Sequence, residues 1–123
     1  MKIPEQYLPV MPYLILSDAK AFFQFTQAAF GAKEQLLVPG PEGTVMHVEI
    51  RIGDAVIMFG QAGESWKQKT AAFYLYVPDV DRIYQCAIAE GATSFEQPLQ
   101  KEYGYTASLE DPFGNYWFIV QPA

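Results

Sequence analysis

The stretch Tyr13-Leu14-Ile15-Leu16-Ser17-Asp18 has a counterpart 61 residues further along the chain, Tyr74-Leu75-Tyr76-Val77-Pro78-Asp79. In both stretches an apolar run of strand length ends at an aspartate. Gly53-Asp54 and Gly114-Asn115 are separated by the same interval, and each precedes another apolar run. Similarity at a fixed interval indicates repeated structural units. The sequence therefore predicts two copies of one unit within 123 residues.

Each copy is expected to begin with a strand and a helix. The first strand is expected at 10–16 and its counterpart at 73–77. Asp18 and Asp79 follow these strands, and aspartate caps helices well because its side chain accepts hydrogen bonds from free backbone N–H groups. Apolar residues then recur every three to four positions until a glycine, which is typical of an amphipathic helix and its end.

Three strand-like segments follow each expected helix. In the first copy they lie at 34–38, 44–52 and 55–60, and in the second at 94–100, 105–110 and 116–121. Stretches rich in glycine, proline, aspartate and asparagine separate them, as in turns. The predicted fold class is α+β, with two tandem βαβββ modules. These modules cover about 9–61 and 70–122 within one domain, 1–123.

Apolar and polar side chains alternate along residues 46–52. The apolar set is Met46, Val48, Ile50 and Ile52, and the polar set is His47, Glu49 and Arg51. Side chains of a strand point alternately to opposite faces of the sheet. The apolar set is therefore expected under a helix and the polar set on the other face. Curved sheets with helices on their outer face and a partly polar inner face form a concave cup.

Composition narrows the classes of partner. Eight Lys and Arg against 14 Asp and Glu give a net charge of -6, which argues against nucleic acid and favours a neutral or cationic small molecule. A single cysteine excludes an intramolecular disulfide. No apolar run approaches the roughly 20 residues of a membrane span, so no membrane partner is expected. No signal peptide is recognisable, and the expected location is the cytoplasm.

Several motifs together resemble the vicinal oxygen chelate superfamily, which includes glyoxalase I, the bleomycin resistance proteins and the extradiol dioxygenases. They are the stretches 13–18 and 45–54, Phe30-Gly31-Ala32, and above all Asp111-Pro112-Phe113-Gly114-Asn115-Tyr116-Trp117. The resemblance covers nearly the whole chain. The Asp-Pro-x-Gly-Asn turn occurs in members with unrelated activities, so it indicates a fold and leaves the function to be argued from a site.

In the metal-dependent members, the resemblance implies up to four metal ligands on the first and last strand of each half. The repeat places these positions at Met11, Ile57, Ala72 and Phe118. Divalent ions of this kind prefer imidazole nitrogens and carboxylate oxygens, which these side chains lack. The expectation is therefore no metal at the family's positions and no cofactor. The resemblance also implies a homodimer, the commonest form of small symmetric oligomers.

Three residues are candidates for acid–base chemistry: His47, Glu49 and Glu110. His47 is the only histidine, Glu49 lies on the same face of the strand, and the repeat makes Glu110 the counterpart of Glu49. Three interpretations stay open. These residues form a metal site with one imidazole and two carboxylates, or ordinary polar pairs on a half-exposed strand, or polar groups that orient a ligand.

Aromatic residues are the other candidates for the site. Alternation along the strands places six of them on the concave face: Tyr13, Phe59, Tyr74, Tyr76, Tyr116 and Phe118. Trp66 lies in the polar stretch that joins the halves, and Tyr103 lies before the seventh strand, so both are expected as flaps. A buried tyrosine hydroxyl needs a partner or water, and four tyrosines therefore favour a pocket with a wet edge.

Two functions fit these patterns. The first is a metal-free binding protein that sequesters a small aromatic or cationic compound, with His47 and the aromatic residues around it. The alternative is a glyoxalase-like lyase, isomerase or dioxygenase with an acid–base site or a relocated metal site at His47, Glu49 and Glu110. The sequence alone leaves open whether a reaction is catalysed.

Overall fold

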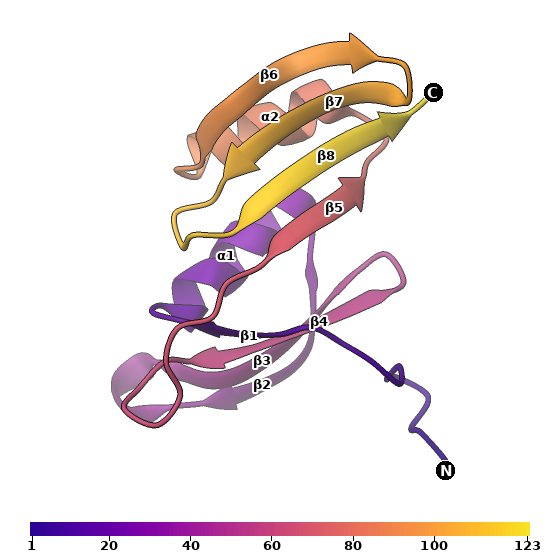
Figure 1. The fold of residues 1–123 in the computed structure, drawn as a ribbon. Helices are drawn as coiled ribbons and strands as arrows, with labels where there is room; N and C mark the ends of the chain where they lie inside the picture. Colours follow the sequence, from indigo (N-terminus) through magenta and orange to yellow (C-terminus); the bar gives the residue numbers. More distant parts are fainter. The chain divides into compact units, whose positions relative to one another are not determined.

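A computed structural model describes all 123 residues, which form two compact units (Figure 1). The first unit comprises residues 1–27 and 31–69, and the second comprises 28–30 and 70–123. Each unit contains one four-stranded mixed sheet. Along the chain, a strand is followed by a helix and then by three further strands. The predicted α+β fold with two tandem βαβββ modules is confirmed. Neither helix has the length and apolar character of a membrane-spanning segment.

In the first unit the sheet order is β1-β4-β3-β2, with β1 parallel to β4 and the other pairs antiparallel. The strands are β1 (Tyr13–Leu16), β2 (Lys33–Pro39), β3 (Val45–Ile52) and β4 (Ala55–Gln61), with the helix α1 (Ala19–Phe30) after β1. A short 3-10 turn, η1 (Pro41–Gly43), joins β2 to β3. Because β1 and β4, the first and last strands of this unit, pair with each other, residues far apart in the sequence meet on one face of the sheet.

Helix α1 begins and ends as predicted. The Asp18 side chain accepts a hydrogen bond from the Ala21 backbone N–H, and Gly31 ends the helix with a φ of 67°, a conformation that favours glycine. Phe22 packs edge-on against Phe59 of β4, with ring centroids 4.8 Å apart. Burying one such side chain contributes about 1.5–3 kcal/mol. This helix-covered face is the core of the first unit.

The predicted position of Phe59 on the concave face is wrong. Phe59 is fully buried on the helix side, where it lies opposite Val48 of β3. A shift of one residue in register moves every side chain of a strand to the other face. The same shift corrects the position that matches Phe118, which is Met58 and not Ile57, because Tyr13 lies beside Met58 as Tyr74 lies beside Phe118.

The prediction that Met46 packs under a helix is also wrong. Its side chain is 56% exposed, whereas Val48 and Ile50 of the same alternating set are fully buried. The pairing of β3 with β4 begins only at His47. Met46 therefore lies beyond the part of the strand that α1 and β4 enclose.

The second unit repeats this plan with the order β5-β8-β7-β6. Its elements are β5 (Ala72–Tyr76), α2 (Val80–Ala89), β6 (Thr93–Lys101), β7 (Gly104–Glu110) and β8 (Tyr116–Pro122). Asp79 caps α2 by accepting from the Arg82 backbone N–H, as predicted. The Tyr105 hydroxyl donates to Asp81 on α2 at 2.7 Å, which ties the helix to its sheet and raises the pKa of Tyr105.

The predicted equivalence of Glu49 and Glu110 is wrong. Glu49 pairs with Met58, and in the second sheet the residue that pairs with Phe118 is Ser108. The cause is that the second unit is two residues shorter between its first and third strands: Glu49 follows Tyr13 by 36 positions, whereas Ser108 follows Tyr74 by 34. The last turn then adds one residue, because five residues separate Glu110 from Tyr116 and four separate Arg51 from Val56. A constant interval therefore cannot align the inner strands.

The Asp111–Asn115 turn is held by its own side chains. The Asp111 carboxylate is buried and accepts from the backbone N–H groups of Phe113 and Asn115, at 2.9 and 3.0 Å. It also accepts from Asn115 Nδ2 at 2.9 Å and from Trp117 Nε1 at 2.8 Å. Asn115 Oδ1 in turn accepts from the Ala71 backbone N–H. This motif therefore fixes where β8 and β5 begin and is structural.

Candidate functional site

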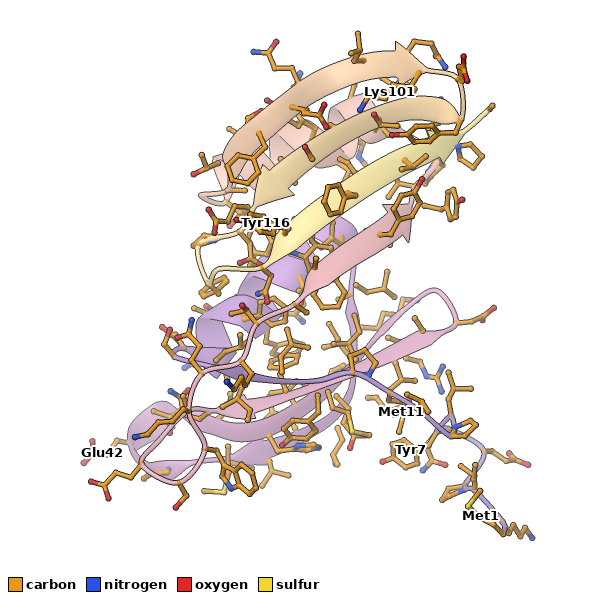
Figure 2. The ribbon with its side chains drawn as sticks, in the orientation of Figure 1. Met1, Tyr7, Met11, Glu42, Lys101 and Tyr116 are labelled. Atoms are coloured by element: carbon orange, nitrogen blue, oxygen red, sulfur yellow. The ribbon has the colours of Figure 1, made fainter.

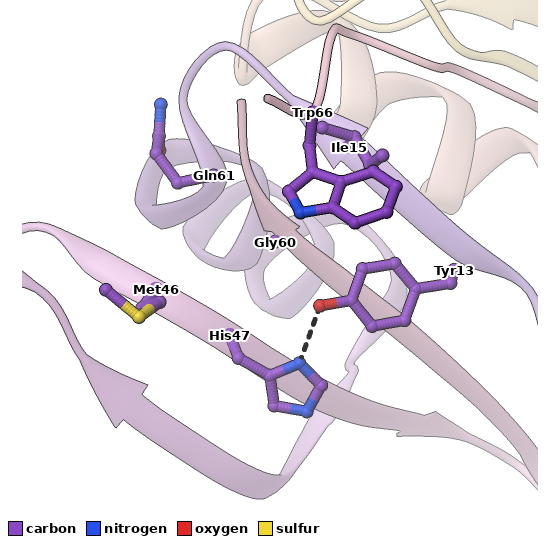
Figure 3. A pocket seen from close by; sticks show the side chains of 7 residues that line it. All are labelled: Tyr13, Ile15, Met46, His47, Gly60, Gln61 and Trp66. Atoms are coloured by element: carbon purple, nitrogen blue, oxygen red, sulfur yellow. Dashed lines mark hydrogen bonds between the residues drawn. The ribbon is translucent and has the colours of Figure 1, made fainter. Parts of the chain in front are cut away.

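A pocket of about 530 Å³ lies in the first unit, on the sheet face opposite α1, which we call the open face (Figure 3). Its volume lies within the range of small-molecule sites, roughly 300–1,000 Å³. Seven residues line it: Tyr13, Ile15, Met46, His47, Gly60, Gln61 and Trp66. A second hollow of about 550 Å³, on the side of Ser17 and Asp18, shares Met46 and Gln61 with the first.

Strand pairing brings these residues together. The parallel pairing of β1 with β4 sets Ile15 beside Gly60, and the antiparallel pairing of β3 with β4 sets His47 opposite Gly60. Tyr13 lies two residues before Ile15 and therefore on the same face. In Figure 3 the lining side chains surround Gly60. The sheet thus gathers side chains of β1 and β3 around a glycine of β4 that leaves space open.

Trp66 reaches this pocket from the segment that follows β4. The Ile15 N–H donates to the Lys69 carbonyl at 3.0 Å, and the Lys69 N–H donates back at 2.8 Å, so the segment returns along β1. The Gly63 N–H donates to the Trp66 carbonyl at 2.9 Å and closes a turn. Trp66 is 72% exposed although its indole lines the pocket. Its expected role as a flap remains a prediction.

Gly60 sets the depth of the pocket. A Cβ atom at this position would lie 2.9 Å from the Tyr13 hydroxyl oxygen and 3.1 Å from the Met46 carbonyl oxygen. Only glycine lets the phenol lie across β4 at this distance without a shift of the neighbours. Gly60 was not among the residues predicted for the site. The available signal was a glycine inside a strand pattern, which often marks a close approach of another group.

A polar chain runs along the open face from the pocket. The Tyr13 hydroxyl lies 3.0 Å from His47 Nδ1, and the two rings stack with centroids 5.6 Å apart. His47 Nε2 lies 2.8 Å from Glu49 Oε2. Glu49 Oε1 accepts from the Tyr7 hydroxyl at 2.8 Å and from Gln35 Nε2 at 3.1 Å. The chain therefore links the pocket to a buried carboxylate.

Glu49 is ionised in this setting although its side chain is almost fully buried. Burial raises the pKa of Glu49, but the hydrogen bonds with His47, Gln35 and Tyr7 together lower it by more, so the net pKa lies below the ordinary value. The same carboxylate raises the pKa of Tyr7, first through their hydrogen bond. A charged Glu49 beside a neutral Tyr7 is the stable combination near neutral pH.

Arg51 fixes the orientation of the Gln35 amide. Arg51 Nε can only donate, and it lies 2.8 Å from Gln35 Oε1, so Gln35 Nε2 must be the atom that faces Glu49. Arg51 Nη2 also donates to the Gln6 carbonyl at 3.0 Å. Gln6 and Tyr7 belong to the N-terminal segment, where Figure 2 labels Tyr7. No sequence signal selected Gln6, Tyr7 or Gln35, since their role depends on contacts between distant parts of the chain.

The structure brings Tyr13, His47, Glu49 and Trp66 into one unit, whereas Phe59 lies in its core. The remaining candidates are in the second unit. Large apolar side chains are exposed on the open face of its sheet and in the turn after β6: Tyr74, Tyr76, Phe95, Leu99, Tyr103, Tyr116 and Phe118. Tyr74 and Tyr76 meet edge-on with centroids 5.5 Å apart. Partial desolvation by its surroundings, followed by the neighbouring Tyr76 and Tyr103, raises the pKa of Tyr74, so its phenol stays neutral.

The polar groups of the second open face are arranged differently. Ser108, the counterpart of Glu49, donates to Glu96 Oε1 at 3.2 Å, and Glu96 pairs with Lys101 at 3.2 Å. The hydrogen bond with Glu96 raises the pKa of Lys101. Glu110 lies on β7 between Thr93 and Tyr116. None of these groups forms a chain like that of His47 and Glu49.

The residues present do not fit the metal that the family resemblance implies. The implied positions, with the corrected register, are Met11, Met58, Ala72 and Phe118. None is a carboxylate, imidazole or thiolate. No group of three His, Cys, Asp or Glu side chains has a metal-binding arrangement. Both ring nitrogens of His47 already have partners, Tyr13 and Glu49.

Comparison with known proteins identifies the family. The family model of the Glyoxalase/Bleomycin resistance protein/Dioxygenase superfamily matches residues 8–119. The chain belongs to this superfamily. This membership confirms the resemblance that the strand order and the Asp111–Trp117 stretch indicated.

Relatives within the superfamily are similar over most of the chain. The uncharacterized protein Mb0911c of Mycobacterium bovis is 33% identical over 126 residues, covering 90% of this chain and 81% of its own. The crystal structure of TioX from Micromonospora sp. ML1 matches with a TM-score of 0.74 at 19% identity, covering 93% of this chain and 99% of that one. TnmS3, an antibiotic binding protein from Streptomyces sp. CB03234, matches with a TM-score of 0.66 at 16% identity, covering 95% and 100%. At these identities the two solved structures show the fold alone.

Proposed function

We propose that this protein is a metal-free binding protein that sequesters a small aromatic compound in the pocket of its first unit. The observation that carries the proposal is the pocket of about 530 Å³, in which exposed Trp66 faces apolar lining from Ile15 and Met46. Pockets of this size with apolar walls and few polar groups are typical of small-molecule sites. The description of the structurally similar TnmS3 as an antibiotic binding protein supports the same class of function.

The exposed indole is the main source of binding energy in this proposal. Trp66 is 72% exposed, and a flat ring that packs on it removes apolar surface from water. An aromatic side chain can bury 150–250 Å², so covering most of the indole contributes about 2–4 kcal/mol before the cost of ordering the ligand. Tyr13 adds a second aromatic surface in the same pocket.

Charge favours a cationic ligand. The net charge is -6, and the ionised Glu49 is hydrogen-bonded to His47, which lines the pocket. A negative field raises the local concentration of cations, and a cation over an indole or phenol face gains further attraction. An aromatic cation therefore fits the pocket better than an aromatic anion.

The test is a screen of aromatic and cationic compounds by thermal shift, followed by titration calorimetry with the wild type, Trp66→Ala and Leu99→Ala. Leu99 is the control because it is 57% exposed but lies in the second unit. We expect Trp66→Ala to weaken binding by about tenfold or more, from the lost aromatic contact. We expect Leu99→Ala to leave it unchanged. Equal binding by the wild type and Trp66→Ala would contradict the proposal.

A second candidate function is acid–base catalysis on a compound with vicinal oxygens. The observation that favours it is the order Tyr13, His47, Glu49, in which a hydroxyl, an imidazole and a carboxylate are joined by hydrogen bonds of 3.0 and 2.8 Å. In such a chain the imidazole takes the hydroxyl proton and the carboxylate stabilises the resulting cation. Turnover that is lost in His47→Ala, with the fold intact by circular dichroism, would support this candidate.

The exposed aromatic face of the second sheet supports a homodimer. Exposed apolar patches of this kind mark interaction sites more often than free surface. In the proposed dimer, each protomer contributes one domain that comprises residues 1–123. Light scattering on the purified protein tests it, and a mass equal to that of one chain would contradict it.

A further inference from the structure

The polar chain fixes the direction of the Tyr13 O–H bond. An ionised Glu49 has no hydrogen to donate, so His47 Nε2 carries the hydrogen that lies between it and Oε2. When the imidazole is neutral, this is its only ring hydrogen, so His47 Nδ1 is an acceptor. The Tyr13 hydroxyl then donates to Nδ1 across 3.0 Å.

The residues that contact Glu49 from the other side maintain this direction of the Tyr13 hydrogen bond. Arg51 turns the Gln35 amide so that its N–H donates to Glu49 Oε1, and the Tyr7 hydroxyl donates to the same atom. Three donors on two carboxylate oxygens stabilise the charged form. The carboxylate, and not His47, is therefore the acceptor at the inner end of the chain.

Tyr13 consequently offers the pocket an acceptor and no donor. A phenol has one hydrogen, and that hydrogen is committed to His47, while a lone pair of the oxygen remains free. The oxygen lies beside the space above Gly60, where an added Cβ would come within 2.9 Å of it. The pocket lining also contains the amide of Gln61. Its Oε1 accepts from the Ala19 N–H, and its Nε2 donates to the Ser17 carbonyl.

We propose that the ligand of this pocket is an aromatic amine in its protonated form, with an N–H that donates to Tyr13 Oη while its ring packs on Trp66. This inference rests on the proposed binding function and specifies the class of ligand. An ammonium group complements the acceptor at Tyr13 and the charge of Glu49 behind it. A carboxylate or carbonyl would meet a lone pair where it needs a hydrogen.

Four probes with one ring system separate the contributions. They are naphthylmethylammonium, its N,N,N-trimethyl analogue, methylnaphthalene and naphthoate. We expect calorimetry to show that naphthylmethylammonium binds about tenfold or more tightly than each of the other three, since a hydrogen bond to a charged group has this size. The trimethyl analogue keeps the charge but has no N–H, so equal affinity for these two cations would overturn the inference.

Tyr13→Phe removes the acceptor and keeps the ring. Tyr13 is 51% exposed, so this variant is expected to fold. It should weaken binding of naphthylmethylammonium by about tenfold and leave methylnaphthalene unchanged. An unchanged affinity for the ammonium probe would overturn the inference.

Glu49→Gln should invert the preference. Two donors, Tyr7 and Gln35, hold the Oε1 position, so the new amide places its oxygen there and its NH₂ toward His47 Nε2. His47 Nε2 must then accept, Nδ1 carries the hydrogen, and the Tyr13 O–H turns into the pocket. We expect naphthoate to bind this variant more tightly than naphthylmethylammonium. Glu102→Gln, the same change at an exposed turn, should keep the original order.

The outcomes separate the two proposals. If no probe binds the wild type, both the proposed binding function and this inference fail. If all four bind alike through Trp66, the binding function stands and the inference fails. If Glu49→Gln does not fold, Tyr13→Phe and the trimethyl analogue decide the inference on their own.

Discussion

The two units share one order of strands and helix, yet their open faces differ. The first carries a pocket and a polar chain that ends in the buried Glu49. The second carries exposed aromatic side chains and the surface pair of Glu96 with Lys101. Since the backbone plan is the same, the difference lies in a few side chains, and fold alone does not specify function.

The matched positions explain why the pocket forms in the first unit. Ile15 lies beside Gly60 in the first sheet, and the equivalent pair in the second sheet is Tyr76 and Val120. Gly60 beside Ile15 leaves space on the open face of the first sheet, whereas Val120 and Tyr76 fill the equivalent space in the second sheet. Glu49 and Ser108 also occupy equivalent positions. Only the Glu49 carboxylate can bind His47 through one oxygen and accept from Tyr7 and Gln35 through the other.

The largest expected effect is a difference in stability loss between variants in the corresponding turns of the two units. Asp111→Ala should lower the free energy of unfolding by about 4 kcal/mol, because it leaves buried N–H groups of Asn115 and Trp117 without an acceptor. Asp54→Ala changes the exposed turn of the first unit and should cost less than about 0.5 kcal/mol. Urea unfolding measures both. Similar losses would mean that the Asp111 network has no special structural role.

Gly60→Val makes the first open face resemble the second. The new side chain enters the space between the Tyr13 hydroxyl and the Met46 carbonyl, so we expect aromatic probes to bind about a hundredfold more weakly or not at all. Gly63→Ala is the matched control, because its Cβ would meet no atom within 4 Å. Calorimetry on both variants is the measurement. Retained binding in Gly60→Val would place the ligand elsewhere.

Acid should reduce the contribution of Glu49 to stability. Its pKa in the folded protein lies below the ordinary value, so its contribution is present above the unfolded-state pKa and is lost as the pH falls through the folded-state pKa. Glu49→Gln should be about 1 kcal/mol less stable than the wild type at neutral pH, with allowance for solvent screening, and the gap should close in acid. Glu96→Gln, at the exposed pair of the second sheet, should show a smaller gap. A gap that is constant with pH would mean that Glu49 is not ionised.

The smallest expected effect concerns the N-terminal segment. Tyr7→Phe removes the hydrogen bond of 2.8 Å to Glu49 and should lower the free energy of unfolding by about 0.5–1 kcal/mol. Because Gln35 and His47 remain as donors, probe affinity should change by less than about twofold. Urea unfolding and calorimetry provide the two measurements. A large loss of affinity would show that Tyr7 is needed to hold the polar chain.

Most of the fold followed from local signals. Asp18 and Asp79 marked the helix starts, and turns separated the strands, because caps and turns depend on neighbouring residues. The faces of the strands were harder to predict. The second unit is two residues shorter before β7 and one residue longer before β8, so the repeat interval is not constant, and this error placed Phe59 on the wrong face.

The site was predictable in part. Alternation along β3 correctly placed His47 and Glu49 on one face, and Tyr13 followed from its position on β1. Gln35 and Tyr7 were not predictable, since each contacts Glu49 from a distant part of the chain. The Glu49 network exists only after the sheet has formed, and no spacing in the sequence encodes it.

The two tryptophans allow the most direct test of the central claim, that the first unit holds the binding site. Trp66 is exposed at the pocket, whereas Trp117 is buried in the second unit between Phe30 and Phe73. The measurement is the NMR signal of each indole N–H during titration with naphthylmethylammonium, assigned with Trp66→Phe. We predict that the Trp66 signal shifts progressively to saturation while the Trp117 signal stays in place. A saturating shift of Trp117 alone would contradict the account.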